Sequence, residues 1–157
     1  MPDLLVKLYD LPAERPVLPE DICIRPVMAA EISHVSHWIE AHFSRGWADE
    51  FERGACAAPV GSIIAVERRQ VIGFACYDAT ALGLFGPTGV GTMARGKGVG
   101  AALLLAALDA MRAKGHAYAI IGWAGPVDFY ARTVGASVIE GSEKRYKGQL
   151  DARADKY

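Results

Sequence analysis

The fold is decided by a short glycine-rich segment, Arg95-Gly96-Lys97-Gly98-Val99-Gly100-Ala101. It lies between an apolar run that ends at Val90 and the clearest helical segment of the chain, residues 99–114. Glycines let a ligand approach the backbone closely, and the first amides of a helix lack internal partners and carry a partial positive charge. The segment therefore predicts a phosphate cradle at a helix N-terminus.

In the rest of the chain, stretches with helical spacing of hydrophobic residues alternate with short stretches typical of strands. Helical spacing predicts four helices, over 29–43, 47–56, 99–114 and 126–133. Short β-rich runs predict strands over 22–25, 62–67, 71–77, 82–90 and 117–123, with an edge strand over 4–9 and a closing hairpin of 136–140 and 146–150. Elements in this order predict an α/β fold with a mixed sheet.

Length and composition are typical of a folded domain. With 157 residues, 52% hydrophobic and 22% charged, the chain can bury a core of its own. The 17 basic and 18 acidic residues leave a formal charge of -1, so no broad positive field would attract nucleic acid or an anionic membrane. We expect one domain over residues 1–157, with residues 1–20 as an irregular, proline-rich lead-in.

Cysteine and histidine usage favours neither disulfides nor a metal. Cys23, Cys56 and Cys76 are odd in number, widely spaced and flanked by apolar residues, which predicts buried thiols in a reducing compartment. His34 and His37 could share a helix face, but no carboxylates with ligand spacing accompany them, so we expect no metal site. The chain starts without a signal-like segment and contains no apolar run of about 20 residues, so we expect a cytoplasmic protein.

Two nucleotide-binding patterns come close to the glycine segment without matching it. Gly91 followed by Gly96-Lys97 approaches a P-loop, but Gly98 stands where a Ser or Thr must bind magnesium. A dinucleotide fingerprint that starts at Gly96 or Gly98 lacks its third glycine, because Ala101 or Leu103 stands there. A degenerate P-loop protein therefore remains only as a distant alternative.

A third pattern, Arg-x-x-Gly-x-Gly, is satisfied by Arg95, Gly98 and Gly100 ahead of an Ala/Leu-rich helix. Here the chain resembles the GCN5-related N-acetyltransferase (GNAT) superfamily, in element order over residues 22–150 and most specifically over 90–101. The resemblance implies a mixed, mostly antiparallel sheet of six or seven strands with about four helices on both faces. It also implies a splayed pair of parallel strands that binds the cofactor.

The same resemblance implies acetyl-CoA as the cofactor and assigns residues to it. The backbone of the strand before the loop would pair with the pantetheine arm, which involves Thr88, Gly89 and Val90. The pyrophosphate would lie on Arg95, Gly96, Lys97, Gly98, Val99, Gly100 and Ala101. In the family, an amide at the Val90 position polarises the thioester carbonyl, and Gly86-Pro87 matches the bulge that parts the two strands.

A second family signature, an aromatic pair followed by glycine, is met by Phe129-Tyr130 and Gly135. It offers Tyr130 as the general acid that protonates the departing thiolate. The chemistry is sound, because a phenol of pKa about 10 can donate to a thiolate whose thiol has a pKa of about 8.5. Trp123 stands where many relatives carry Asn, and Pro126 stands where they carry Ala, so the role of that Asn has no counterpart here.

The acceptor side leaves alternatives open. An amine must lose a proton to attack, and Asp78, Glu50, Glu52 and His37 are candidates for the base, with Asp78 and Glu50 preferred. We expect an N-acetyltransferase that acts by direct attack of a small-molecule or peptide amine in a ternary complex.

A non-catalytic acyl-CoA-binding sensor of the same fold is the alternative, and a homodimer is compatible with the sequence. In the family, the first helices border the acceptor pocket, so Trp38, Trp47 and Phe51 could shape it.

Overall fold

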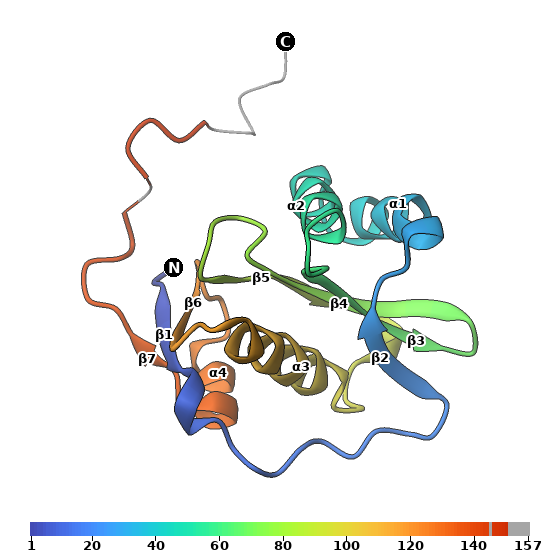
Figure 1. The fold of residues 1–157 in the computed structure, drawn as a ribbon, viewed down its shortest axis with the longest axis horizontal. Coiled ribbons are helices and arrows are strands. Elements are labelled where there is room, and N and C mark those ends of the chain that lie inside the picture. The colour runs from blue at the N-terminus through green and yellow to red at the C-terminus, as the bar shows by residue number, and fades with distance from the viewer. Residues whose placement is uncertain (145, 151–157) are drawn as a thin grey trace.

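The computed structural model describes residues 1–144 and 146–150. A seven-stranded sheet is covered on one face by α1 (Ile32–His42) and α2 (Arg45–Ala55) and on the other by α3 (Val99–Lys114) and α4 (Val127–Val134) (Figure 1). The expected mixed α/β fold, with helices on both faces of the sheet, is confirmed.

The strands are joined in the spatial order β2-β3-β4-β5-β6-β1-β7. Their bounds are β1 (Leu4–Lys7), β2 (Ile22–Pro26), β3 (Ser62–Glu67), β4 (Gln70–Tyr77), β5 (Leu84–Val90), β6 (Tyr118–Ile121) and β7 (Ser137–Val138). Short 3-10 turns, η1 (Leu8–Asp10), η2 (Ala29–Glu31) and η3 (Thr92–Ala94), punctuate the chain. β5 and β6 run parallel, whereas every other neighbouring pair is antiparallel.

The N-terminal strand is not at the edge of the sheet, and this prediction was wrong. Leu4 lies opposite Ile121 of β6 on one side and opposite Val138 of β7 on the other. Leu4 and Val6 are fully buried. β1 is therefore an interior strand, inserted between two strands from the far end of the sequence.

The closing hairpin is only half present. Residues 137–138 form β7, but they pair with β1, and residues 146–150 form no strand. β7 pairs with β1 on one side, and within the described residues no strand pairs with its other side. Local strand composition could not predict the pairing of β7 with β1, because β1 lies more than 130 residues earlier in the chain.

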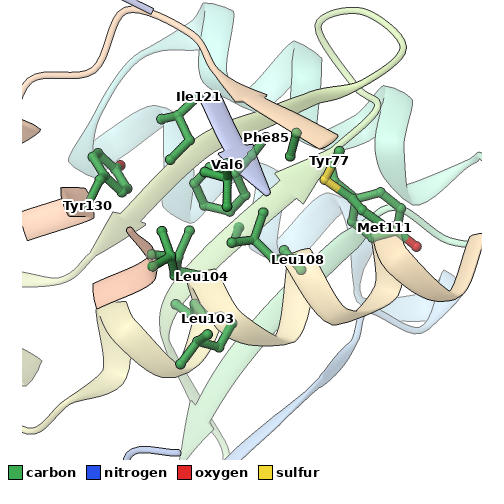
Figure 2. Close-up of a cluster of buried hydrophobic side chains, with 14 of the residues drawn as sticks. Val6, Tyr77, Phe85, Leu103, Leu104, Leu108, Met111, Ile121 and Tyr130 are labelled. Atoms are coloured by element: carbon green, nitrogen blue, oxygen red, sulfur yellow. The ribbon is translucent and has the colours of Figure 1, made fainter. Parts of the chain in front are cut away.

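Two hydrophobic cores lie on the two faces of the sheet. The larger one gathers Leu104, Leu108 and Met111 of α3 against Val6 and Ile121 (Figure 2). The smaller core packs side chains of α1 and α2 against β3 and β4, among them Ile39, Phe51 and Phe74. Each helix pair thus fixes one face of the strands that form the site.

The cysteines differ from the expectation. Cys76 is buried and its surroundings raise the pKa of its thiol to about 12, chiefly through desolvation. Cys23 and Cys56 are exposed, because Cys23 points outward from β2 and Cys56 follows the end of α2. No helix within the described ranges is long and apolar enough to cross a membrane.

Candidate functional site

The site begins where β5 and β6 stop pairing. The two strands are paired only at Leu84 with Ile120 and at Phe85 with Ile121, after which β6 ends while β5 continues to Val90. Gly86-Pro87 lies at this step, and the register of β5 against β4 also shifts there. Beyond Phe85, β5 therefore has a strand neighbour on one edge only.

The unpaired edge of β5 offers backbone groups to a ligand. The amide of Gly91 donates to the carbonyl of Ile72 in β4 at 2.8 Å. Because backbone groups alternate in direction along a strand, Val90 turns its N–H and C=O toward the opposite edge, as does Thr88 two residues earlier. An extended chain can hydrogen-bond along such an edge as an added strand would.

The glycine segment forms a loop that leads into α3 at the end of this edge. Gly98 is the N-cap of α3 with φ 81°, and its carbonyl accepts the first helical hydrogen bond, from Ala102 at 3.0 Å. The amides of residues 99–101 precede that bond and so have no partner within the helix. Gly96 also has a positive φ, of 82°, which directs the loop into this conformation. The result is a helix N-terminus with three amides that lack partners within the helix, an arrangement that favours anions.

The two cations of the segment are both engaged. Lys97 Nζ lies 2.8 Å from Oε1 of Glu67 at the end of β3. Arg95 Nε donates to the outward-facing carbonyl of Val90 at 3.4 Å. The lead-in also reaches this point, since a Cβ on Gly98 would lie 3.6 Å from Cβ of Pro16. Neither the Glu67 pair nor the Pro16 contact had a signal in the sequence pattern.

Tyr130 lies in α4 beside the start of the separation. Its ring makes edge-to-face contacts with Phe85, at 6.4 Å between centroids, and with Phe129, at 5.2 Å. The residue is 6% exposed, and desolvation raises the pKa of its phenol above the usual 10 (Figure 2). In the described chain the hydroxyl has no hydrogen-bond partner, and it is not sealed from solvent. The phenol of Tyr130 is therefore protonated and nearly buried, and it lies beside Phe85 of β5.

Asp78 has a different setting from the one expected of a base. Its carboxylate accepts hydrogen bonds from Lys114 Nζ at 2.7 Å, from the amide of Gly83 at 2.6 Å and from His116 Nε2 at 2.9 Å, and the side chain is 7% exposed. Lys114 is the last residue of α3, about 24 Å from its first. Asp78 thus ties a turn to the end of α3 that lies away from the cradle.

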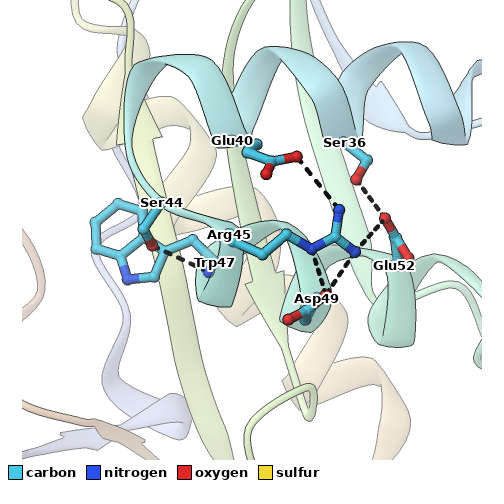
Figure 3. A network of polar contacts seen from close by, with 7 residues as sticks. All are labelled: Ser36, Glu40, Ser44, Arg45, Trp47, Asp49 and Glu52. Carbon is cyan, nitrogen blue, oxygen red and sulfur yellow. Dashed lines mark hydrogen bonds and ion pairs between the residues drawn. The ribbon is translucent and has the colours of Figure 1, made fainter. Parts of the chain in front are cut away.

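Glu50 and Glu52 lie on different sides of α2. Glu52 accepts a short hydrogen bond from Ser36 and, with Glu40 and Asp49, belongs to the carboxylates held by Arg45 between α1 and α2 (Figure 3). Glu50 instead accepts from Thr80 Oγ1 at 2.7 Å, in the turn before β5. Of the two carboxylates, only Glu50 contacts the turn that precedes β5.

The remaining candidates divide between core and surface. Phe51 is fully buried in the smaller core, so it does not line an open site, whereas Trp47 is 37% exposed. His37 is exposed on α1. Trp123 follows β6 with φ 46°, and its amide donates to Oδ1 of Asp3 at 2.9 Å. Among the residues that the structure describes, no group of three or more His, Cys, Asp or Glu could hold a metal ion.

This arrangement agrees with a comparison to protein families. Residues 29–135 match the sequence model of the acetyltransferase (GNAT) family, which is more than half of the chain. The chain therefore belongs to the acetyltransferase (GNAT) family. No curated protein matches the sequence.

Solved structures share the fold at low identity. One is the GCN5-related glucosamine N-acetyltransferase region of a fungal multi-domain β-N-acetylglucosaminidase, with 16% identity and a TM-score of 0.68 over 88% of this chain and 19% of that chain. A GCN5-related N-acetyltransferase from Sphaerobacter thermophilus has 20% identity and a TM-score of 0.69 over 88% of this chain and 48% of that chain. The chain thus spans less than half the length of either.

A relative of similar size is a GNAT family acetyltransferase from Brucella melitensis, whose structure is a complex with acetyl-CoA. It is 19% identical, with a TM-score of 0.56 over 83% of this chain and 93% of that chain. At this identity the likeness concerns the fold alone.

Proposed function

We propose that the protein transfers an acetyl group from acetyl-CoA to an amine by direct attack. One observation carries the proposal: the unpaired edge of β5 runs from the cradle at Gly98 to the bulge at Gly86-Pro87, beside Tyr130. The length of strand between the two suits an extended arm with an anion at one end and a reactive group at the other. The acetyl-CoA complex of the Brucella melitensis relative supports the same ligand.

The residues present fit this cofactor. The amides of residues 99–101 would hold the pyrophosphate, with Arg95 and Lys97 supplying positive charge. Thr88 and Val90 would hydrogen-bond the pantetheine arm through their outward N–H and C=O groups. When bound, acetyl-CoA supplies an acetyl thioester. A main-chain amide at the bulge end of this edge would polarise its carbonyl.

Side chains of the protein would then transfer the protons and hold the reactants in position. The new bond joins the amine nitrogen to the acetyl carbon, and the bond from that carbon to sulfur breaks. Tyr130, held protonated by its burial, would give its proton to the departing thiolate. Glu50 would accept the proton that the amine loses, directly or through water. Positioning of the reactants supplies the rest of the acceleration.

Acetyl-CoA turnover over a panel of amines, with wild type and Tyr130→Phe, tests the proposal. Loss of a general acid typically costs about 100-fold or more in kcat. We therefore expect kcat to fall by that factor in Tyr130→Phe while the Kd for CoA stays unchanged. If CoA bound tightly to the wild type but no amine were acetylated, the protein would be an acyl-CoA-binding sensor instead.

A further inference from the structure

Two stacked aromatic rings, those of Phe43 and Trp47, form a wall against the strand that we assign to the pantetheine arm. Phe43, in the turn between α1 and α2, is stacked on Trp47 with 5.3 Å between ring centroids. A Cβ on Gly89 would lie 2.5 Å from Cζ of Phe43, so the phenyl ring rests on the backbone of β5. Phe74 supports both rings from beneath, at 5.8 and 6.1 Å. The wall is therefore rigid and fixed relative to β5.

The outer ring of this wall is open to ligands. Trp47 is 37% exposed although it is packed against two other rings. Its amide is held at 3.2 Å by the hydroxyl of Ser44, the N-cap of α2, and its indole turns away from the polar network around Arg45 (Figure 3). An apolar surface of this kind can accept an aromatic or aliphatic group face to face.

One carboxylate, that of Glu50, lies on the same flank of α2 as Trp47. Glu50 is three residues after Trp47, so the two side chains share one flank of α2, and the bond from Thr80 to Glu50 Oε1 turns this flank toward the turn that enters β5. Within the described ranges, Oε2 of Glu50 has no polar partner. Arg53, the cation next along this flank, donates to the carbonyls of Ala79 and Thr80 and forms no ion pair with Glu50.

The other carboxylates of α1 and α2 share one cation, Arg45. Arg45 pairs with Asp49 at 2.6 Å and with Glu40 and Glu52 at 3.3 Å, on the far side of α2 from Trp47. A polyamine or an aminoglycoside carries several positive charges, so its complement is a cluster of carboxylates on one surface. This flank offers one, together with two aromatic faces.

Resting on the acetyl transfer proposed above, we infer that the acceptor is a primary monoamine with an aromatic or branched apolar body. The body packs on Trp47 and Phe43, and the ammonium group lies beside Glu50, which accepts its proton before attack. An aromatic face next to the ammonium group adds a cation–π attraction that a neutral competitor lacks.

The test measures binding and turnover separately with three amines: 2-phenylethylamine, spermidine and glycine. Calorimetry on the CoA-saturated protein reports amine binding without any need for transfer. We expect 2-phenylethylamine to bind and react with a kcat/KM at least 10-fold above the other two. Trp47→Ala should raise its KM at least 10-fold, whereas the KM for acetyl-CoA should not change.

Three further variants make the result specific. Trp47→Leu keeps apolar volume in case Trp47→Ala fails to fold, and it should still weaken 2-phenylethylamine. Tyr9→Ala removes a 63% exposed aromatic residue that contacts Tyr118 of β6 and not α2, and it should leave all constants at wild-type values. Glu50→Gln should move the rise of kcat/KM to higher pH, toward the pKa of the free amine.

The outcomes separate the two proposals. Preference for spermidine or glycine, or a Trp47→Leu protein with wild-type KM for 2-phenylethylamine, overturns the acceptor class and leaves acetyl transfer intact. Binding of 2-phenylethylamine that depends on Trp47, without acetylation of any amine, supports the binding site and overturns acetyl transfer. Absence of 2-phenylethylamine binding to the CoA-saturated protein overturns the acceptor class directly.

Discussion

Lys97 and Glu67 form an ion pair at 2.8 Å, so a cation of the phosphate cradle is already matched by a carboxylate of β3. The lysine is 38% exposed and the glutamate 21% exposed. Pairs at this degree of exposure stabilise a protein by at most about 1 kcal/mol. A bound pyrophosphate can therefore compete with Glu67 for Lys97.

Substitution of each partner tests whether Lys97 binds the phosphates of CoA or only holds the loop in place through Glu67. Lys97→Ala should raise the Kd for CoA about 10-fold, equivalent to about 1.4 kcal/mol, because a charge that faces the phosphates is lost. Glu67→Gln should leave the Kd unchanged or lower it about threefold, because a competing carboxylate is removed. Calorimetry at low and high salt measures both. If Glu67→Gln weakened CoA as much as Lys97→Ala, the pair would serve to hold the loop in place.

The conformation of Gly98 should have a measurable cost when a side chain is added. With φ at 81°, an L-residue there is strained by about 1–2 kcal/mol, although the added Cβ would only touch Pro16 and Leu18. We expect Gly98→Ala to lower the free energy of unfolding in urea by that amount. Gly46→Ala is the matched control, because its Cβ meets nothing within 4 Å in helix α2 and should stabilise the protein by about 0.5–1 kcal/mol. Equal effects of the two would contradict the strained loop.

Asp78 should prove a structural residue. Burial disfavours its charged form, yet the bonds from Lys114, the amide of Gly83 and His116 outweigh this and lower the pKa of the carboxyl. Asp78→Asn should therefore destabilise the fold by about 1–3 kcal/mol, since it leaves buried donors without a charged acceptor. At a temperature where the variant stays folded, its kcat should remain near wild type. If Asp78→Asn lowered kcat and shifted its pH profile, Asp78 would be the general base and not a structural residue.

Acid stability should depend on Glu31. Its pKa is lowered to about 2, first by the hydrogen bond from Arg25 and then by the amide of Met28. A lowered folded-state pKa gives stability that is complete above about pH 4.5 and is lost as the pH falls to about 2. The difference in unfolding free energy between wild type and Glu31→Gln should therefore shrink over this range. Glu14→Gln, at an exposed residue without a polar partner in the described chain, should show no such trend.

The conformation of the glycine loop and the helix that follows could be predicted because their signals are local. Gly96 and Gly98 need positive φ for the turn, and the helix that follows has apolar spacing of its own, so both are written within twenty residues of sequence. The separation of β5 from β6 was likewise expected from Gly86-Pro87. These features depend on backbone conformation, which short stretches of sequence largely determine.

Features that depend on distant partners could not be predicted. Asp78 follows a strand like many exposed turn residues, and only the packing of α3 brings Lys114 and His116 to it. Glu50 and Glu52 look alike in sequence, and the rotation of α2 against α1 decides which one Arg45 neutralises. Pairing between residues far apart in the chain is a property of the whole fold.

The position of β1 gives the sharpest prediction about stability. Leu4 is fully buried between β6 and β7, whereas Leu5, its neighbour in the same strand, is only half-buried on the other face. Leu4→Ala should lower the free energy of unfolding by about 2–5 kcal/mol, because it leaves a cavity in the larger core, and Leu5→Ala should cost clearly less. Urea denaturation of both variants measures the difference. Equal losses would contradict the burial of Leu4 in the larger core, since alternate residues of a strand face opposite sides of the sheet.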